Sequence, residues 1–594
     1  MKEKWVVAGK RADFAAIGQA FGIDPVVARI IRNRDLTEME DIRKFLTGGK
    51  EDLHDPHLLK DVEKGADILK RNIDSQKKIR IIGDYDIDGV QATYILLTGL
   101  KRCGADVDTA IPDRIRDGYG INEDLIRQAA ADGVDTIITC DNGISAFEPI
   151  ALAKALGMTV VVTDHHEVPV EVQDEAAGET KLHRQMLVAA DAIINPKQSD
   201  CTYPFEGLCG AAVAYKFIQV LYEKMGIPVE ESDVFIENAG FATVGDVMAL
   251  VDENRILVKI GLKMLNHTTN LGMRALILQN QLTFGEVKAW HIGFKIGPCL
   301  NASGRLDTAK RALKLLLAEN EIQAGALAAE LTSLNEERKD MTALAVAEAM
   351  EVIASQGMSN DKVLVVYLPE CHESLAGIVA GRLREAYYRP ALVVTKGEQD
   401  AKGSARSIEG YSMYEELHRC SDLLLKYGGH PMAAGFSLKE DRIDQLRSQL
   451  NANCQLAEED LTPKLLIDVP MPVDYISKEL IQQLELLEPF GKDNEKPVFA
   501  DHDLEICSLG IFGKEHNVVR MRLKSQYGTT MDGVYFGNPE NLRVSIAAKY
   551  DKVLADKVLG GVRDTGVKLH FSYYPDLNSY QGLESIQLKI TGFC

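Results

Sequence analysis

Residues 79–89 read IRIIGDYDIDG, an apolar run that leads directly into three alternating carboxylates. The isoleucines favour a buried β-strand, and the glycine and aspartate that follow them favour its end. A calcium loop of the helix-loop-helix type also opens with D-x-D-x-D-G, but it needs a preceding helix and a glutamate at position twelve. Here a strand precedes the acids, and Ile95 stands at position twelve. A helix cap near Gly89 explains one aspartate but not three.

Two further apolar runs end in the same way. Residues 136–140 lead into Asp141-Asn142-Gly143, and residues 160–163 lead into Asp164-His165-His166. Each group alone could be a cap or a turn, and a single histidine is more often structural than a ligand. Three polar strand ends in succession are better explained by one shared site.

The region from about residue 56 to 255 alternates short β-branched runs with longer helical stretches. This alternation predicts an α/β domain with a parallel, doubly wound sheet. Its strands are expected at Ile79–Gly83, Asp135–Cys140, Met158–Thr163 and Ala192–Asn195. Because ligands bind beyond the carboxyl ends of such strands, the three polar groups are expected to meet there.

The ligand types indicate which ions this crevice would hold. So many carboxylates would repel one another without cations. Carboxylates with one or two imidazoles suit Mn²⁺ or Mg²⁺, and we favour manganese, whereas structural zinc usually brings thiolates. Two such ions about 3.5 to 4 Å apart would activate water and hydrolyse a phosphodiester or a phosphoanhydride.

The rest of the chain predicts a multidomain protein. Residues 1–55 are expected to form a helical preface, and 256–356 a helical connector whose long helix could equally be part of a bundle. A second α/β domain is expected over 357–455, with a strand at Val363–Tyr367. Short strand-like segments over 456–594 predict a small barrel or sandwich, which resembles an oligonucleotide-binding (OB) fold, and we expect its aromatic residues to be mostly core.

Composition places limits on location and partners. The 594 residues carry a net charge of −21, which disfavours nucleic-acid binding by the surface as a whole. One basic groove could still exist, lined by Lys295, Arg305, Arg382, Arg384, Arg389, Lys402 and Arg406. The start of the chain has no signal-peptide pattern, and no window is apolar enough to span a membrane, so we expect a cytoplasmic protein. Ten scattered cysteines without a CxxC pair are expected to be reduced core thiols.

Several motifs resemble one known family. GDYDIDG, CDNG and TDHH resemble the DHH phosphoesterases, and residues 240–246 resemble the segment that carries their last metal-binding aspartate. Residues 297–305 (GPCLNASGR), 403–407 (GSARS) and 428–430 (GGH) resemble the RecJ branch, including its second domain, called DHHA1. The resemblance covers most of the chain from about 75 to 505.

The resemblance implies a single-strand-specific DNA exonuclease that works 5′ to 3′, releases nucleoside monophosphates and serves recombination and repair. It implies a metal site formed by Asp84, Asp86, Asp88, Asp141, His165, His166 and Asp246. Among these, Asp86, Asp88, Asp141 and His165 are expected to be catalytic, while Asp164 would orient a histidine. Substrate would be held by Arg114, Arg305, His372, Ser404, Arg406 and His430. The enzyme is expected to be a monomer that binds single-stranded DNA, and its partners could include a single-strand-binding protein and a helicase.

Some positions depart from the family pattern. Cys299 stands where an arginine is usual, Gly245 and Ala249 where alanine and proline are usual, and DNEKP replaces GNPxP near residue 493. Without the resemblance, Arg305 and Arg406 would be read as ordinary surface ion-pair partners.

Two other functions are compatible with parts of the sequence. One is a relative that cleaves short oligonucleotides, cyclic dinucleotides or pyrophosphate, although the barrel-like tail favours longer strands. The other is a replication scaffold without catalysis, which loss of metal ligands would mark. All seven expected ligands are present.

Overall fold

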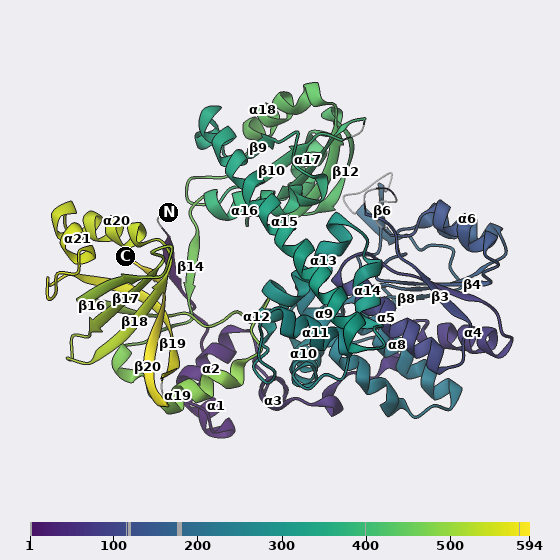
Figure 1. The fold of residues 1–594 in the computed structure, drawn as a ribbon, viewed down its shortest axis with the longest axis horizontal. Helices are drawn as coiled ribbons and strands as arrows, with labels where there is room; N and C mark the ends of the chain where they lie inside the picture. The colour runs from purple at the N-terminus through teal and green to yellow at the C-terminus, as the bar shows by residue number, and fades with distance from the viewer. Residues whose placement is uncertain (1–2, 115, 117–119, 175–180, 398, 581) are drawn as a thin grey trace. The chain divides into compact units, whose positions relative to one another are not determined.

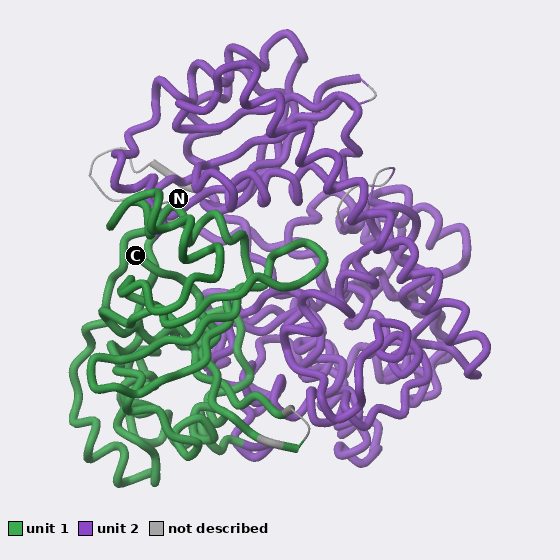
Figure 2. Tube along the Cα trace, turned by 60° about the vertical axis from the view of Figure 1, so that its left-hand side comes forward, with its two compact units in different colours: residues 1–48, 464–594 green, residues 49–463 purple. Residues whose placement is uncertain are grey.

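The chain forms two compact units in a computed structural model that describes residues 3–114, 116, 120–174, 181–397, 399–580 and 582–594. One unit is residues 49–463, and the other joins residues 1–48 to residues 464–594 (Figure 2). The sequence had set residues 1–55 apart as a separate preface. In the structure, strand β1 (Lys4–Val7) pairs in parallel with β14 (Lys464–Ile467), which ties the first residues to the C-terminal unit.

The first sheet of the larger unit is the predicted parallel sheet, whose strands β3, β4 and β8 are labelled in Figure 1. Its strand order is β3-β2-β4-β5-β8. The strands are β2 (Ile79–Ile82), β3 (Val107–Ala110), β4 (Thr136–Cys140), β5 (Thr159–Thr163) and β8 (Ala192–Ile194). The sequence missed only β3, a short edge strand whose residues are half-buried and half polar. A hairpin, β6 (Val170–Asp174) with β7 (Lys181–Gln185), follows β5.

Helices cover both faces of this sheet because successive side chains of a strand point to opposite faces. Ile81 and Ile138 pack in a core with helices α4 (Val62–Asp74), α5 (Ile87–Arg102), α8 (Gly210–Met225) and α9 (Ile236–Gly245). Ile82 and Ile137 pack in a second core with α6 (Glu123–Ala131) and α7 (Phe147–Ala155). Strands buried on both sides leave their carboxyl ends as the place where polar residues gather.

A helical segment then connects two α/β domains within the same unit. It contains α10 (Asp252–Leu265), α11 (Leu271–Gln279), α12 (Ala289–His291), a π-helical turn η4 (Ile292–Ile296), α13 (Gly297–Leu306), α14 (Lys310–Leu316) and α15 (Glu321–Ser355). Helix α15 contributes Ala328 and Leu331 to a core with α11, α13 and α14. It contributes Ala345 and Ile353 to the core of the next domain. One long helix thus belongs to both cores, as a connector does.

The second α/β domain has the strand order β12-β13-β11-β10-β9. Strands β9 (Leu364–Tyr367) and β10 (Ala391–Thr395) are parallel, and β11 (Ala401–Arg406), β13 (Ala433–Leu438) and β12 (Leu424–His430) extend the sheet antiparallel. Its helices are α16 (Ala376–Tyr387), α17 (Met413–Arg419) and α18 (Ile443–Asn453). Both motifs that the sequence had singled out here, GSARS and GGH, lie in the antiparallel strands or at their ends.

The smaller unit contains the predicted barrel. Its strands are β15 (Val469–Pro470), β16 (Phe499–Phe512), β17 (Val518–Lys524), β18 (Thr530–Phe536), β19 (Lys568–Tyr580) and β20 (Leu583–Phe593). The order β16-β17-β18-β20-β19 closes on itself because β19 also pairs with β16. Helices α1 (Phe14–Phe21), α2 (Pro25–Asn33), α3 (Met39–Thr47), α19 (Lys478–Leu484), α20 (Pro539–Lys549) and α21 (Lys552–Leu559) complete the unit.

The aromatic residues of the tail divide between core and surface. Phe571, Tyr573 and Tyr574 are buried, as expected for core residues, whereas Tyr527 and Phe536 are exposed. In the described part of the chain, no single helix is long and apolar enough to cross a membrane; the pair α1 and α2 meets that test only jointly and is bent by 108°. Seven of the ten cysteines are buried, and all ten are free thiols.

Candidate active site

The three polar strand ends meet, together with the end of α9. Ligand atoms lie within 4.8 Å of one another in three overlapping groups: Asp84 with Asp86 and Asp141; Asp88 with His165 and Asp246; and Asp141 with His165 and His166. All seven expected metal ligands are therefore in one cluster, which we call the acidic cluster. His165 lies at its centre, with Nε2 at 3.0 Å from Asp141 Oδ1, 3.5 Å from Asp88 Oδ2 and 3.9 Å from Asp246 Oδ2.

Asp84 and Asp141 are buried at the bottom of the acidic cluster. Both oxygens of Asp84 are inaccessible, and neither has a hydrogen-bond partner among the described residues. Burial and the charge of Asp86 raise the pKa of Asp84 well above its ordinary value, and burial and the charge of Asp88 do the same for Asp141. Asp141 also has a left-handed backbone, with φ 61°, which aspartate and asparagine tolerate better than most residues.

Asp164 organises the two histidines rather than joining the acidic cluster. Its Oδ1 accepts hydrogen bonds from the amides of His165 (2.7 Å) and His166 (3.1 Å), and it lies 2.8 Å from His166 Nδ1. Its Oδ2 accepts from the amide of Ile144 at 2.9 Å. Burial lowers the pKa of His166, but the hydrogen bond to Asp164 and the charges of Asp164, Asp246 and Asp88 together outweigh it and raise that pKa to about 9. Asp164 thus holds the strand end and orients an imidazole, as a metal site requires.

Asp88 joins the starts of two helices at the acidic cluster. It lies in the first turn of α5, and its two oxygens accept hydrogen bonds from the amides of Gly210 (2.6 Å) and Ala211 (2.8 Å) at the start of α8. A Cβ on Gly210 would lie 2.7 Å from the Asp141 side chain, so only glycine fits there. These backbone donors stabilise negative charge at a helix N-terminus.

The connector motif at 297–305 supports the aspartate loop. Asn301 accepts a hydrogen bond from the amide of Ile87 at 2.8 Å, which fixes the start of α5 between Asp86 and Asp88. A Cβ on Gly304 would lie 2.2 Å from the carbonyl oxygen of Tyr85, so α13 can approach the loop only through a glycine. The motif is therefore a structural support as well as the source of Arg305.

The donors present fit divalent cations that prefer oxygen and nitrogen. The acidic cluster offers five carboxylates and two imidazoles, and the candidate groups found among the described residues contain no thiolate. Apart from the two orphaned oxygens of Asp84, Nδ1 of His165 is also buried without a partner in the described structure. Buried charge of this kind is stable only with compensating cations or bound protons. The residues thus suit Mn²⁺ or Mg²⁺.

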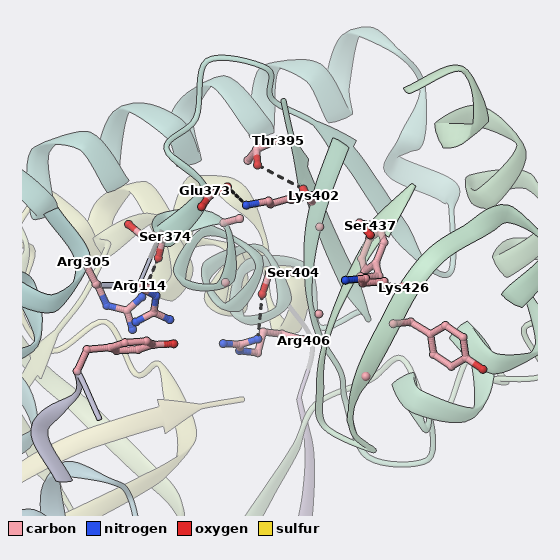
Figure 3. Close-up of a pocket in the computed structure, with 18 residues that line it drawn as sticks. Arg114, Arg305, Glu373, Ser374, Thr395, Lys402, Ser404, Arg406, Lys426 and Ser437 are labelled. Carbon is pink, nitrogen blue, oxygen red and sulfur yellow. Dashed lines mark hydrogen bonds and ion pairs between the residues drawn. The ribbon is translucent and has the colours of Figure 1, made fainter. Parts of the chain in front are cut away.

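A basic cavity of about 540 Å³ lies next to the acidic cluster in the same unit (Figure 3). Tyr85, the residue between Asp84 and Asp86, forms part of its wall, and the guanidinium of Arg114 lies over the Tyr85 ring at 4.7 Å. Arg305 donates to the carbonyl of Ser374 at 2.7 Å, and Arg406 to the carbonyl of Ala405 at 2.8 Å. We call this space the arginine cavity.

The three arginines of the cavity repel one another and have no carboxylate ion-pair partner among the described residues. Burial and the charge of Arg114 lower the pKa of Arg305 to about 10, and burial with the charge of Arg384 lowers the pKa of Arg406. The alternative that Arg305 and Arg406 are surface ion-pair partners is therefore wrong. Converging guanidinium groups that have no ion-pair partner in the described structure are suited to a phosphate.

Of the six residues expected to bind substrate, four line the arginine cavity and two do not. Arg114, Arg305, Ser404 and Arg406 all line the arginine cavity. His372 does not line it, but its Nδ1 is 2.7 Å from the hydroxyl of the lining residue Ser374. His430 is exposed at the end of β12 and is not among the lining residues.

The expected basic groove is also only partly present. Arg305, Lys402 and Arg406 line the cavity. Arg382 and Arg384 pair with Glu385, and Arg389 binds backbone carbonyls of the loop near 360. Lys295 instead lies over the Trp290 ring, at 5.7 Å.

The departures from the family pattern lie outside the arginine cavity. Cys299 is buried and faces Asn280 and Asn335 of the connector. A Cβ on Gly245 would lie 2.5 Å from the end of the Ile87 side chain, so this glycine relieves a contact beside the acidic cluster. Ala249 accepts a hydrogen bond from Asn254 through its carbonyl.

Sequence reasoning missed four contributors to the site. Tyr85 stands between two recognised aspartates but was not assigned a role, and Asn301 and Gly304 lie inside a quoted motif. Lys426 lines the cavity from β12. Tyr85 could have been found from the alternation of the GDYDIDG loop, but nothing local marks Lys426.

Comparisons with known proteins agree with this architecture. Family models match residues 78–237 (DHH family, N-terminal domain), 360–456 (DHHA1 domain) and 467–592 (RecJ OB domain). The single-stranded-DNA-specific exonuclease RecJ of Bacillus subtilis is 36% identical over 91% of this chain, a match that spans 66% of that protein. The Escherichia coli protein of the same name is 30% identical over 96% of this chain and 95% of its own.

A solved structure agrees over the whole length. The crystal structure of RecJ in complex with Mn²⁺ from Thermus thermophilus has a TM-score of 0.80 at 26% identity and covers 100% of this chain and 79% of that one. The three domains, their order and the residues of the acidic cluster lead to one conclusion. This chain belongs to the RecJ family of DHH phosphoesterases.

Proposed function

We propose that this chain is a metal-dependent exonuclease that degrades single-stranded DNA from its 5′ end and releases nucleoside 5′-monophosphates. The observation that carries the proposal is the position of Tyr85, which links the acidic cluster to the arginine cavity. A terminal phosphate in the cavity would place the next phosphodiester at the acidic cluster, so that one nucleotide is removed at a time. The names of the relatives support the substrate, and the family supports the direction.

The residues have separate tasks in this proposal. Two divalent cations, Mn²⁺ or Mg²⁺, would supply an activated water and stabilise the charge of the displaced oxygen. Asp84, Asp86, Asp88, Asp141, His165, His166 and Asp246 would hold them. Asp164 keeps His166 in its orientation, and the amides of Gly210 and Ala211 keep Asp88 in place. The guanidinium groups of the cavity bind the 5′ phosphate bidentately.

The OB barrel would supply a further surface for single-stranded DNA. Arg520, Arg522 and Lys524 alternate on the exposed side of β17, and Arg520 lies 5.4 Å from the ring of the exposed Phe512. Basic and aromatic side chains on an OB-type strand bind single strands without sequence preference. The proposal also includes a cytoplasmic monomer that works with a single-strand-binding protein and a helicase.

A strand-selective degradation assay tests the proposed function. With Mn²⁺, the purified protein should shorten a 5′-phosphorylated single strand to mononucleotides and spare a blunt duplex, and a chelator should stop the reaction. Degradation from the 3′ end, equal attack on the duplex, or full activity in the chelator would each contradict it.

Metal affinity should depend on pH in one direction. The pKa values of Asp84, Asp88 and Asp141 are raised, and that of His166 is raised to about 9, so protons occupy metal-ligating atoms below these values. Because a metal must displace those protons, the apparent affinity for Mn²⁺ should rise as pH rises from about 6.5 to 9. Calorimetry in two buffers of different ionisation enthalpy should show protons released on binding. Affinity that is constant over this range would contradict the assignment of His166 as a ligand.

A further inference from the structure

The arginine cavity is larger than one terminal phosphate requires, and the part of it away from Arg114 and Arg305 is lined by lysine and hydroxyl side chains. Beyond Ser404 and Arg406 it is lined by Thr395, Lys402, Lys426 and Ser437. We call these four residues the lysine lobe. Figure 3 shows Lys402 and Lys426 on two different strands of the second sheet, on the side of the cavity away from Arg114 and Arg305.

Strand register explains why the lobe adjoins the phosphate-binding residues. Lys402 pairs with Ser437, which pairs with Lys426, and the next residues on that face are Ser404, Gly435 and Gly428. Side chains two residues apart share a face and are roughly 7 Å apart. The row of Ser404 therefore lies in the middle, with the row of Arg406 on one side of it and the row of Lys402 and Lys426 on the other.

Glycines make the floor between these rows open. A Cβ on Gly428 would meet nothing within 4 Å, and a Cβ on Gly435 would meet only a backbone oxygen at 4.0 Å. Their φ angles are not in the left-handed region, so backbone conformation does not require glycine at either position. What glycine provides here is unfilled space along the sheet surface.

The charges in the lobe favour an anion. Among the described residues, the ammonium group of Lys426 has no ion-pair or hydrogen-bond partner. Lys402 is paired with Glu373 at 2.8 Å, so one carboxylate opposes the two lysines. Ser437 adds a hydroxyl group, whereas the hydroxyl of Thr395 already donates to the carbonyl of Lys402 at 3.3 Å. The lobe is therefore net positive and offers a hydroxyl donor, a chemistry that suits phosphate oxygens.

We infer that the lysine lobe binds the additional phosphates of a 5′-oligophosphate end, so that the enzyme accepts single strands that begin with a 5′-triphosphate. The inference rests on the proposed function, because it places the first phosphate at Arg305 and Arg406. Phosphates attached to that group on the side away from the acidic cluster would extend along the glycine floor toward Lys402 and Lys426.

The chemical step is the same for both kinds of end. Water adds to the phosphorus between the first two nucleotides, the bond from that phosphorus to the 3′ oxygen breaks, and the 3′ oxygen takes the proton. The first product is then a nucleoside 5′-triphosphate, and the shortened strand has a 5′-monophosphate. The lobe is used only in the first turnover, so the identity of the first product shows whether the lobe accepts the additional phosphates.

The test compares two single strands that differ only in a 5′-monophosphate or a 5′-triphosphate, labelled in the first nucleotide. The expected first product from the triphosphate strand is the nucleoside triphosphate. The ratio of kcat/KM for the triphosphate strand to that for the monophosphate strand should fall about tenfold in Lys426→Gln. It should rise in Glu373→Gln, which frees Lys402. Lys439→Gln, outside the cavity, should leave the ratio unchanged.

Each other outcome overturns the inference. Three outcomes would contradict the inference and leave the proposed function intact. The triphosphate strand could stay intact while the monophosphate strand is degraded, the triphosphate strand could first lose pyrophosphate, or its first product could be a dinucleotide. A ratio that is the same in Lys426→Gln and the parent protein would also sink it. If neither strand is degraded, the proposed function fails first, and the inference falls with it.

Discussion

Asp141→Asn is expected to lower single-strand cleavage at saturating Mn²⁺ by about a thousandfold or more, because the metal-held water and charge stabilisation are together worth several kcal/mol. Asp141 takes part in two of the three ligand groups, so no other side chain can replace it. The substitution keeps the shape of the side chain and the left-handed backbone at φ 61°.

The same variant should be more stable than the parent protein when metal is absent. Asp141 is buried beside Asp88, and the charge of that neighbour contributes to the raised pKa of Asp141. A carboxyl group with a raised folded-state pKa costs stability as pH rises above the ordinary carboxyl value, and the amide removes that cost. Thermal melts at pH 8 in a chelator should show a higher Tm. Asp106→Asn, an exposed aspartate of the same unit, is the control and should change neither activity nor Tm. More than a tenth of the parent activity in Asp141→Asn would count against the metal assignment.

Arg305→Gln is expected to lower kcat/KM on 5′-phosphorylated single strands by about a hundredfold and to remove most of the preference for a 5′-phosphate over a 5′-hydroxyl. A bidentate bond to phosphate is worth roughly 1.5 to 3 kcal/mol, and the half-buried position of Arg305 among other arginines favours the upper end. Arg305→Lys should restore only part of the preference, because an ammonium group cannot form the paired contact.

Comparing strands with a 5′-phosphate and a 5′-hydroxyl separates a loss of phosphate binding from a general disturbance of the cavity. Arg305 also binds the carbonyl of Ser374, so its loss could disturb the cavity in general. In that case both substrates would lose activity equally, and the phosphate assignment would be wrong. Arg382→Gln, an exposed arginine of α16 that pairs with Glu385, is the matched control and should behave like the parent protein.

The acidic cluster could be predicted from sequence because each part of it is local. Every ligand group at a strand end follows a buried β-branched run, and a parallel sheet brings such strand ends to one edge. The same logic predicted four of the five strands of the first sheet and missed its half-polar edge strand, Val107–Ala110.

Other features depend on contacts between distant segments. Strand β1 pairs with residues 464–467, and no local pattern reports a partner so far along the chain. The antiparallel strands at 401–406 and 433–438 are rich in glycine and alanine, which have low strand propensity, so neither was predicted as a strand. Only residues 403–407 were recognised, as a motif. Only the family resemblance predicted the arginines of the cavity, because they come from three separate segments of the chain. No sequence pattern indicated Lys426.

The most direct test of the proposed metal site is an anomalous difference map recorded at the manganese absorption edge from crystals soaked in Mn²⁺. Two peaks about 3.5 to 4 Å apart are expected among Asp84, Asp141 and His165, and at least one of them should be lost in Asp141→Asn. Peaks only at other positions, or none in the parent protein at saturating Mn²⁺, would contradict the assignment of the acidic cluster as a two-metal site.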